Sequence, residues 1–429
     1  MMNWRKPIIY SLLYLSGSNI LGYLDEIKKI ENYPEEKIRR YQERKLKKIL
    51  LHACKNVPYY RKTLKKAEVV KNSRIDLENF ENIPFLTKNI IRKQGKNIYS
   101  KDYRKRKPYE NTSGGSTGEP VRFIQDKRYN EWNIANKLWI KLKAGQDIGD
   151  KELRFWGSER DLLEGKESLK IRLRNWLYNR KELNTFKMSK EDMVSYADEI
   201  NSYGPAWIEA YVQSIYEFAK FIKKKNLKIH SPENGILTSA GTLYPDMRKL
   251  LEEVFRCKVY NRYGSREVGD MACGEDSLRL SFWNHFIEVI NRKIYVTGLN
   301  NYSMPTIRYD MGDIGKLDAD GFNLSKLEGR EMSMLRTNSG KLIPPEFFIH
   351  FIGVVYNNNS IEKFQVIQNS SGNIKIKVKL MDRNQFEKDK DKIEEAIKLE
   401  MGRCNVYWDI MDDISATHNG KYEYVRREI

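Results

Sequence analysis

The middle of the chain has the pattern that most constrains the fold. From about residue 120 to residue 320, short apolar segments alternate with helical stretches. Residues 208–226, IEAYVQSIYEFAKFIKKKN, predict one helix, and the apolar run NGILTSA at 234–240 predicts the strand that follows it. Alternation of this kind is typical of an α/β architecture. The 429 residues suffice for two or three domains, at about 150 residues each.

The first 110 residues predict helices joined by breaks. Apolar residues of the segment 35–53 fall on one helical face, namely Ile38, Leu46, Ile49 and Leu50. Extended breaks are expected at 56–60 and 82–88, because proline disfavours helical geometry in the residue before it. The apolar run at 8–15 is too short to span a bilayer. It predicts a docking helix, with weak association with a membrane surface as the alternative.

Beyond about residue 330 the pattern changes. Two strand-like segments, IEKFQVI and IKIKVKL, precede a predicted helix at 388–402 and a predicted strand at 405–411. A small α+β domain of roughly 100 residues fits this order. The expected division is therefore a basic helical part, an α/β part and a small C-terminal α+β domain, over residues 1–110, 111–328 and 329–429.

Positive charge is concentrated near the N-terminus. The chain has 77 Lys and Arg against 58 Asp and Glu, a formal charge of +19, and residues 1–110 hold 27 basic and 12 acidic residues, or +15. Such an excess attracts nucleic acid, anionic lipid or a polyanionic substrate. The alternative is a solvated basic surface on helices. No nucleic-acid-binding signature accompanies the charge, so nucleic acid is not an expected partner.

Composition and cysteine spacing narrow the class of protein. With 40% hydrophobic and 31% charged residues, the chain is too apolar for a disordered tail and too polar for a polytopic membrane protein. Its four cysteines lie far apart, which argues against a zinc ribbon or a disulfide-stapled secreted domain. A soluble protein of the reducing cytoplasm is expected.

A cluster of glycine and hydroxyl residues is the strongest local motif. Residues 111–121 read NTSGGSTGEPV. Glycines let backbone N–H groups approach an anion, and hydroxyl side chains add donors to phosphate oxygens. The segment lacks the G-K-[ST] ending of a P-loop and the G-x-G-x-x-G of a dinucleotide-binding fold. Taken alone, it fits either a phosphate-binding loop or an ordinary flexible loop.

Weaker motifs follow. In VYNRYGSREVGD at 259–270, Tyr263 could stack on a base and Glu267 could hold Mg²⁺, which prefers one or two carboxylates plus substrate phosphates. The alternative is a strand and turn with Tyr263 in the core. The segments 304–317 and 327–348 add candidate ligands for ribose hydroxyls, phosphate or carboxylate: Asp310, Asp313, Arg308 and Arg330. A metal at Cys273, Glu275 and His285 is disfavoured, because their spacing matches no standard zinc pattern.

The order of these motifs resembles that of the adenylate-forming superfamily of acyl-coenzyme A synthetases. The sequence runs TSGGSTGEPV, YGSRE, RYDMGD and GR, and ends with HNGKYEYV at 418–425. More narrowly, LLHACKNVPYYRK at 50–62 and IPFLTKNIIR at 83–92 are similar to the phenylacetate-coenzyme A ligase-like branch that includes the CapK capsular polysaccharide proteins. The resemblance implies a large N-terminal α/β domain of the adenylate-forming type and a small, mobile C-terminal α+β domain.

The resemblance also implies roles for individual residues. The mobile loop over the ATP phosphates would comprise Thr112, Ser113, Gly114, Gly115, Ser116, Thr117 and Gly118. Tyr263, with Gly264 and Ser265 beside it, is similar to the adenine-stacking tyrosine, and Glu267 to the catalytic magnesium-binding glutamate. Asp313 and Arg330 are similar to the ribose-binding aspartate and the arginine at the domain junction. Lys421 looks like the catalytic lysine of the small domain.

The implied activity is an ATP- and Mg²⁺-dependent ligase that converts a small carboxylic acid to an acyl-adenylate. The acyl group would pass to a thiol such as coenzyme A, or to a sugar amine or hydroxyl in polysaccharide biosynthesis. The alternative is a non-catalytic nucleotide-binding or scaffold member of a glycan-assembly complex. Two departures from the superfamily stand out: Val121 and Arg122 follow Pro120 where many members have lysine, and Ser333 replaces a frequent hinge aspartate.

Overall fold

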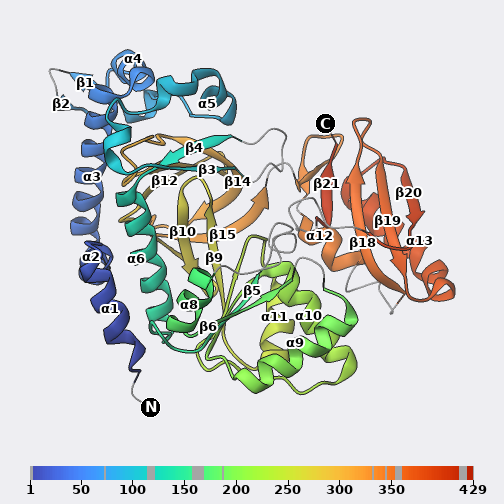
Figure 1. Ribbon diagram of the computed structural model, residues 1–429. Coiled ribbons are helices and arrows are strands. Elements are labelled where there is room, and N and C mark those ends of the chain that lie inside the picture. The colour runs from blue at the N-terminus through green and yellow to red at the C-terminus, as the bar shows by residue number, and fades with distance from the viewer. Residues whose placement is uncertain are drawn as a thin grey trace.

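The computed structural model shows a large α/β body and a smaller C-terminal lobe (Figure 1). The structure describes residues 3–71, 74–113, 121–156, 169–185, 188–330, 333–343, 345–352, 360–414 and 423–428. The α/β class expected from the sequence is confirmed.

An eleven-stranded mixed sheet forms the centre of the body. Its order is β12-β13-β14-β15-β11-β10-β9-β8-β7-β5-β6. Strands β6, β5, β7, β8 and β9 pair parallel. From β9 to the opposite edge of the sheet at β12, every neighbouring pair of strands is antiparallel. The strands are β5 (Glu152–Trp156), β6 (Arg180–Asn184), β7 (Trp207–Tyr211), β8 (Gly235–Ser239), β9 (Val259–Ser265), β10 (Gly269–Gly274), β11 (Leu278–Leu280), β12 (His285–Ile290), β13 (Lys293–Gly298), β14 (Tyr309–Leu317) and β15 (Asn323–Arg330).

Helices cover both faces of the parallel half. On one face pack α9 (Lys190–Tyr203), α10 (Val212–Lys225) and α11 (Pro245–Phe255), and near the other face lie α6 (Lys127–Lys143) and α8 (Leu169–Leu177). The helix predicted over 208–226 is wrong at its start, because residues 208–211 belong to β7. That strand pairs on both sides and is almost fully buried, and a strand buried on both faces shows a continuous apolar run rather than alternation.

The first three N-terminal helices form a column along one side of the body, and the other two lie at the top of the view in Figure 1. They are α1 (Arg5–Leu15), α2 (Ile20–Ile30), α3 (Glu35–Asn56), α4 (Pro58–Lys66) and α5 (Lys88–Gln94), with η1 (Phe80–Asn82), η2 (Gly95–Ile98), η3 (Tyr103–Arg106) and a hairpin of β1 (Val70–Lys71) and β2 (Arg74–Ile75). The break predicted over 56–60 shrinks to Val57, because Pro58 fits the first helical position of α4. In the described part of the chain, no helix is both long enough and apolar enough to cross a bilayer.

The C-terminal lobe is a four-stranded sheet with one long helix. Its order is β20-β19-β18-β21, with β18 and β19 antiparallel and both outer pairings parallel. The elements are β18 (Ile361–Gln368), β19 (Ile374–Leu380), α13 (Arg383–Met401), β20 (Val406–Ile410) and β21 (Val425–Arg427), preceded by β16 (Leu335–Arg336), β17 (Leu342–Ile343) and α12 (Pro345–His350). The strands and helix predicted here are confirmed. Val212 and Met247 of the body join the apolar core of this lobe.

Candidate active site

Two paired strands flank the glycine-rich motif. Strands β3 (Tyr109–Thr112) and β4 (Arg122–Gln125) pair antiparallel, with Thr112 opposite Arg122. Two bonds close the neck: Ser113 N–H donates to the Val121 carbonyl at 2.9 Å, and Val121 N–H donates to Ser113 Oγ at 2.9 Å. The buried Ser113 oxygen therefore fixes the hairpin. The remaining loop residues of the prediction, Gly114, Gly115, Ser116, Thr117 and Gly118, lie outside the described residues.

The same hairpin holds the turn that bears Glu267. The Asn111 amide donates to the Arg266 carbonyl at 3.2 Å, and the Gln125 amide donates to the carbonyls of Arg266 and Glu267 at 2.8 and 3.1 Å. Because both amides sit in the strands that flank the loop, the predicted phosphate loop and the predicted magnesium ligand share one hydrogen-bonded support.

Two further side chains are hydrogen-bonded to the backbone of this turn and of the strand that follows it. His285 Nε2 donates to the Val268 carbonyl at 2.7 Å, and the Asn136 amide of α6 donates to the Asp270 carbonyl at 3.0 Å. Burial lowers the pKa of His285 to about 4, so the imidazole is neutral and carries its proton on Nε2. No group of three or more His, Cys, Asp or Glu side chains among the described residues, Cys273, Glu275 and His285 included, is placed to hold a metal ion.

The Glu267 side chain is free to meet a ligand. Glu267 is 7% exposed, and among the described residues its carboxylate makes no hydrogen bond or close ion pair. Nearby, Ser265 Oγ and the Tyr309 hydroxyl are buried and lack partners within the same described part. A buried carboxylate without a partner is costly unless a cation compensates it. This donor set fits Mg²⁺ held by one carboxylate and substrate phosphates.

Tyr263, Asp313 and Arg330 meet across three strands. The Tyr263 hydroxyl of β9 donates to Asp313 Oδ2 of β14 at 2.7 Å. Arg330 of β15 lies opposite Asp313 in the strand register, with Arg330 Nε 3.6 Å from Asp313 Oδ1. The Tyr263 ring is 7% exposed and belongs to the body core, so its adenine-stacking role stays a prediction. A carboxylate has about four acceptor sites, which leaves Asp313 able to accept from ribose hydroxyls.

Burial and charge act together on this cluster. Burial raises the pKa of the Asp313 carboxyl, and the Arg330 guanidinium opposes the shift. Burial also raises the pKa of the Tyr263 phenol, and the Asp313 carboxylate adds to that effect. The raised pKa of Tyr263 keeps the phenol protonated as the donor, while the Arg330 guanidinium and the Tyr263 hydrogen bond offset part of the cost of burying the Asp313 carboxylate.

Lys88 is a site residue that the sequence reasoning missed. Leu86 pairs with β14: its N–H donates to the Arg308 carbonyl, and its carbonyl accepts from Asp310 N–H, both at 2.9 Å. Lys88 follows as the first residue of α5, capped by Thr87 Oγ1. Burial lowers the pKa of the half-buried Lys88, while the nearby Glu267 carboxylate opposes the shift. The signal available in the sequence was only its place in IPFLTKNIIR.

Gly264 allows β9 and β10 to approach closely beside the site. A Cβ at this position would lie 2.5 Å from the Gly269 carbonyl oxygen and 2.9 Å from Asp270 Cα. Both obstacles are backbone atoms, which cannot rotate away as a side chain could. Any larger residue would therefore push apart the strands that carry Tyr263 and the Glu267 turn.

Arg262, next to Tyr263 on β9, belongs to a different, closed cluster. Its guanidinium lies 2.8 Å from Glu209 Oε1 and 3.6 Å from Asp270 Oδ1. Burial alone would raise the pKa of Glu209, but the cations of Arg262 and its neighbours hold it well below its usual range. The whole cluster consists of four cations and four carboxylates that pair with one another. They are Lys141, Arg154, Arg180 and Arg262 with Glu152, Glu182, Glu209 and Asp270.

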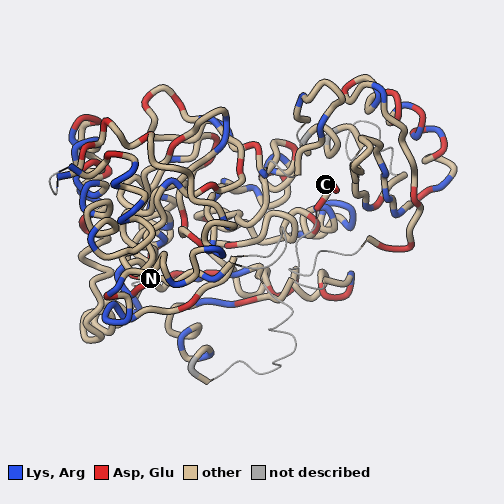
Figure 2. Tube along the Cα trace, turned by 90° about the horizontal axis from the view of Figure 1, so that it is seen from above, with Lys and Arg blue, Asp and Glu red and all other residues tan. Residues whose placement is uncertain are grey.

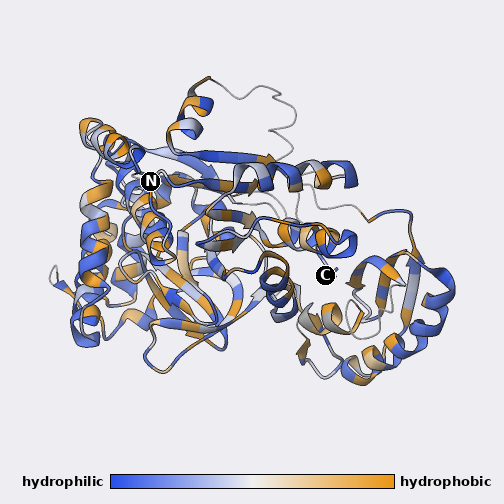
Figure 3. Cartoon of the chain, turned by 90° about the horizontal axis from the view of Figure 1, so that it is seen from below, coloured by the Kyte–Doolittle hydropathy of each residue, from blue (hydrophilic) through white to orange (hydrophobic). Residues whose placement is uncertain are grey.

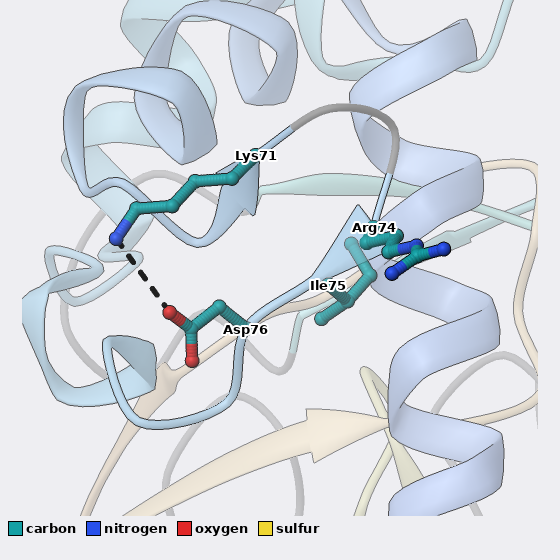
Figure 4. A pocket seen from close by; sticks show the side chains of 4 residues that line it. All are labelled: Lys71, Arg74, Ile75 and Asp76. Carbon is teal, nitrogen blue, oxygen red and sulfur yellow. Dashed lines mark ion pairs between the residues drawn. The ribbon is translucent and has the colours of Figure 1, made fainter.

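Other candidates from the sequence do not join the site. Arg308 is buried against Glu288, at 2.9 Å, and the Ile83 carbonyl, at 2.7 Å. An open pocket on the β1–β2 hairpin is lined by Lys71, Arg74, Ile75 and Asp76, with Lys71 and Asp76 paired at 3.6 Å (Figure 4). It shares no residue with the site.

The small domain contributes a contact to the body close to its C-terminal strand. The Tyr424 hydroxyl is hydrogen-bonded to Gln213 at 3.1 Å and to Glu217 at 3.3 Å, both on α10. Ser333, the predicted hinge departure, is half-buried after β15. Lys421 lies outside the described residues, so its catalytic role stays a prediction.

Comparison with known proteins agrees with this arrangement. Residues 335–428 match the CapK C-terminal domain family. The chain is 24% identical to Protein CapK of Staphylococcus aureus over 457 aligned positions, which cover 99% of this chain and 98% of that protein. Among solved structures, 2-hydroxyisobutyryl-CoA ligase in the postadenylation state with R3-HIB-AMP has a TM-score of 0.69 at 16% identity, covering 92% of this chain and 90% of that one.

The same ligase in the thioesterification state, with 2-HIB-AMP and CoA, has a TM-score of 0.52 at 16% identity, covering 92% of this chain and 91% of that one. At these identities the likeness defines the fold. The predicted large N-terminal domain with a smaller C-terminal domain is confirmed.

Proposed function

We propose that the protein is an ATP-dependent ligase that activates a carboxylic acid. The proposal starts from the adenylate-forming fold and the CapK-type C-terminal domain. The observation that carries the proposal is the meeting of Tyr263, Asp313, Arg330 and Glu267 beside the neck of the glycine-rich hairpin. These residues come from separate segments of the sequence. A scaffold protein would have no need to bring them together.

In the proposed reaction, a carboxylate oxygen of the substrate attacks the α-phosphorus of ATP. A new C(=O)O–P bond forms, the bond from the α-phosphorus to the bridging oxygen breaks, and pyrophosphate leaves. Negative charge increases on the phosphoryl oxygens in the transition state, so fixed cations nearby lower the barrier. Arg330 and Lys88 are the described cations at the site, and Lys421 would add a third.

Glu267 is the proposed magnesium ligand, with Ser265 Oγ and the Tyr309 hydroxyl as buried groups able to bond ligated water or phosphate. Bound Mg²⁺ would neutralise phosphate charge and orient the triphosphate. Asp313 would accept from the ribose hydroxyls while Tyr263 keeps its carboxylate oriented.

The acceptor in the second half-reaction is proposed to be coenzyme A or a sugar amine or hydroxyl in polysaccharide assembly. The name Protein CapK of the full-length relative motivates the sugar alternative. The higher TM-score against the postadenylation form than against the thioesterification form supports a domain arrangement suited to the first half-reaction. We place the reaction in the cytoplasm, since all four cysteines are unpaired and disulfides are rare in reducing compartments.

The decisive experiment is ATP–pyrophosphate exchange with a panel of carboxylic acids. Acid-dependent exchange that requires Mg²⁺ is expected, and an acceptor panel of coenzyme A and amino sugars would then discharge the adenylate. The Lys421→Ala variant should lose exchange while it still binds ATP. Absence of exchange with every acid, in protein shown to bind ATP, would favour the non-catalytic alternative.

A further inference from the structure

Two helices far apart in the sequence present apolar residues to solvent at one place on the surface. In α1 and the residue before it, Trp4, Ile8, Leu12 and Leu15 are exposed. Their spacing of four, four and three residues places them on one stripe of the helix. In α8, Leu169, Leu173 and Trp176 form a second stripe at the same kind of spacing. Leu15 and Leu169 are 79% and 81% exposed, so packing among the described residues explains neither stripe.

The two stripes meet. The rings of Trp4 and Trp176 lie 6.0 Å apart, and the Arg5 guanidinium lies 4.5 Å from the Trp4 ring centroid and 5.9 Å from that of Trp176. The opposite side of α1 is anchored, because Ile9 is buried and Leu13 packs against the body core. Helix α1 thus has two apolar faces: an inner face that packs against the body and an outer face that is exposed to solvent.

The charged residues within the two helices are all basic, and one of them, Lys6, is paired with Asp147 of the body at 2.5 Å. The sequences of α1 and α8, RKPIIYSLLYL and LKIRLRNWL, contain five basic residues and no acidic residue. Arg172 and Arg174 are exposed between the apolar positions of α8. Several Lys and Arg positions surround the N-terminus in Figure 2, and α8 projects from the body with basic segments in Figure 2 and apolar segments in Figure 3.

We infer that α1 and α8 form a docking surface for an anionic membrane. Tryptophan and leucine next to Lys and Arg, without acidic residues, are the composition of helices that lie in the lipid interface. Each basic residue near an anionic leaflet adds attraction that is screened by salt. The formal charge of +15 in residues 1–110 favours the same orientation. A protein partner would require acidic groups to match this rim, and a second copy of the same basic surface would repel it.

The inference is independent of the proposed ligase activity and is tested on the full chain. The protein is sedimented with vesicles of phosphatidylcholine alone and with vesicles containing about 30% phosphatidylglycerol, at low and high salt. We expect binding to the anionic vesicles at low salt and a marked fall at high salt. The L15S/L169S variant should bind at least about tenfold more weakly, because it removes apolar groups that would enter the interface.

Matched controls separate insertion from simple charge attraction. L399S removes a leucine of α13 that is equally exposed and should bind as the unmodified protein does. R172Q/R174Q should weaken binding, whereas K388Q/K392Q, on exposed lysines of α13, should have little effect. The fluorescence of Trp4 and Trp176 should shift to shorter wavelength on binding, and a W4F/W176F variant should lose that shift.

Three outcomes would overturn the inference. The first is no binding of the folded protein to anionic vesicles at low salt. The second is equal binding by L15S/L169S and the unmodified protein, which would leave only non-specific charge attraction. The third is a concentration-dependent dimer that L15S/L169S abolishes in the absence of lipid, which would assign the surface to self-association instead. Circular dichroism and thermal unfolding of each variant confirm that the fold is retained.

Discussion

The two faces of β9 handle charge in opposite ways. On one face Arg262 lies in a buried cluster in which carboxylates and cations pair with one another. On the other face, one residue later, Tyr263 lies near Asp313, Arg330 and Lys88, and near the Glu267 carboxylate, which makes no hydrogen bond or close ion pair with the part of the chain that is described. On the first face each charged group lies near a group of opposite charge. The second has cations and carboxylates at longer range, which a charged substrate could bring together. The contrast indicates that structure depends on one face and chemistry on the other.

The largest expected effect on the closed face follows removal of one charge. Arg262→Ala should lower the free energy of unfolding by about 3–5 kcal/mol, because it removes the nearest cation from the buried Glu209 and the cation that pairs with the buried Asp270. Urea unfolding measures this change. Arg40→Ala, which breaks an exposed pair with Glu36, is the matched control and should change stability by less than about 1 kcal/mol. An equally small effect for Arg262 would refute the closed-face description.

On the open face, charge removal should affect activity rather than stability. Glu267→Gln should reduce Mg²⁺-dependent pyrophosphate exchange by about a hundredfold, comparable to the loss of one charge-stabilising group. Its stability should equal or exceed that of the unmodified protein, since an unpaired buried charge is removed.

Glu275→Gln, at a half-exposed carboxylate that pairs with Lys258, is the control for this substitution and should keep full exchange. Loss of folding in Glu267→Gln would show that this carboxylate stabilises the structure, which would contradict the contrast between the two faces of β9.

His285, which is hydrogen-bonded to the turn that bears Glu267, should make the free energy of unfolding depend on pH. The folded pKa of His285 is about 4 against a usual 6.5, so between these values the unfolded chain binds a proton that the folded chain does not. The stability that neutral His285 contributes is therefore fully present above pH 6.5, and it falls as the pH drops toward 4. From neutral pH to pH 5 we expect a loss of about 2 kcal/mol.

Unfolding curves of His285→Gln measured over the same pH range provide the comparison, because glutamine can still donate to the Val268 carbonyl but cannot titrate. Parallel pH profiles for the two proteins would contradict the buried, neutral histidine.

The smallest expected effect is that of Lys88→Met. Loss of a half-buried cation near Glu267 and Asp313 should weaken ATP binding about tenfold, equivalent to roughly 1.4 kcal/mol. Calorimetric titration measures the dissociation constant. Lys93→Met, at an exposed lysine of the same helix, should leave it unchanged. Equal effects of both variants would mean that only the general positive charge of the region matters.

The sequence predicts the site where motifs are local and misses it where contacts are long-range. The order of YGSRE, RYDMGD and GR identified Tyr263, Glu267, Asp313 and Arg330, and the structure brings these residues close together. Lys88 was missed because its position depends on the pairing of Leu86 with β14, which no local pattern reveals. Strand β7 was likewise missed inside a predicted helix, because burial on both faces, which includes even its charged Glu209, removes the alternation that identifies strands.

The pairing of Leu86 with the start of β14 also bears on how the protein is made. The two hydrogen-bonded segments are more than two hundred residues apart in the sequence. During synthesis, the strand-like stretch around Leu86 leaves the ribosome long before its partner exists, and contacts of such separation form late. This pairing can then form only after the start of β14 has been synthesised. Until that moment, the nascent chain exposes an unpaired edge that a chaperone is suited to shield.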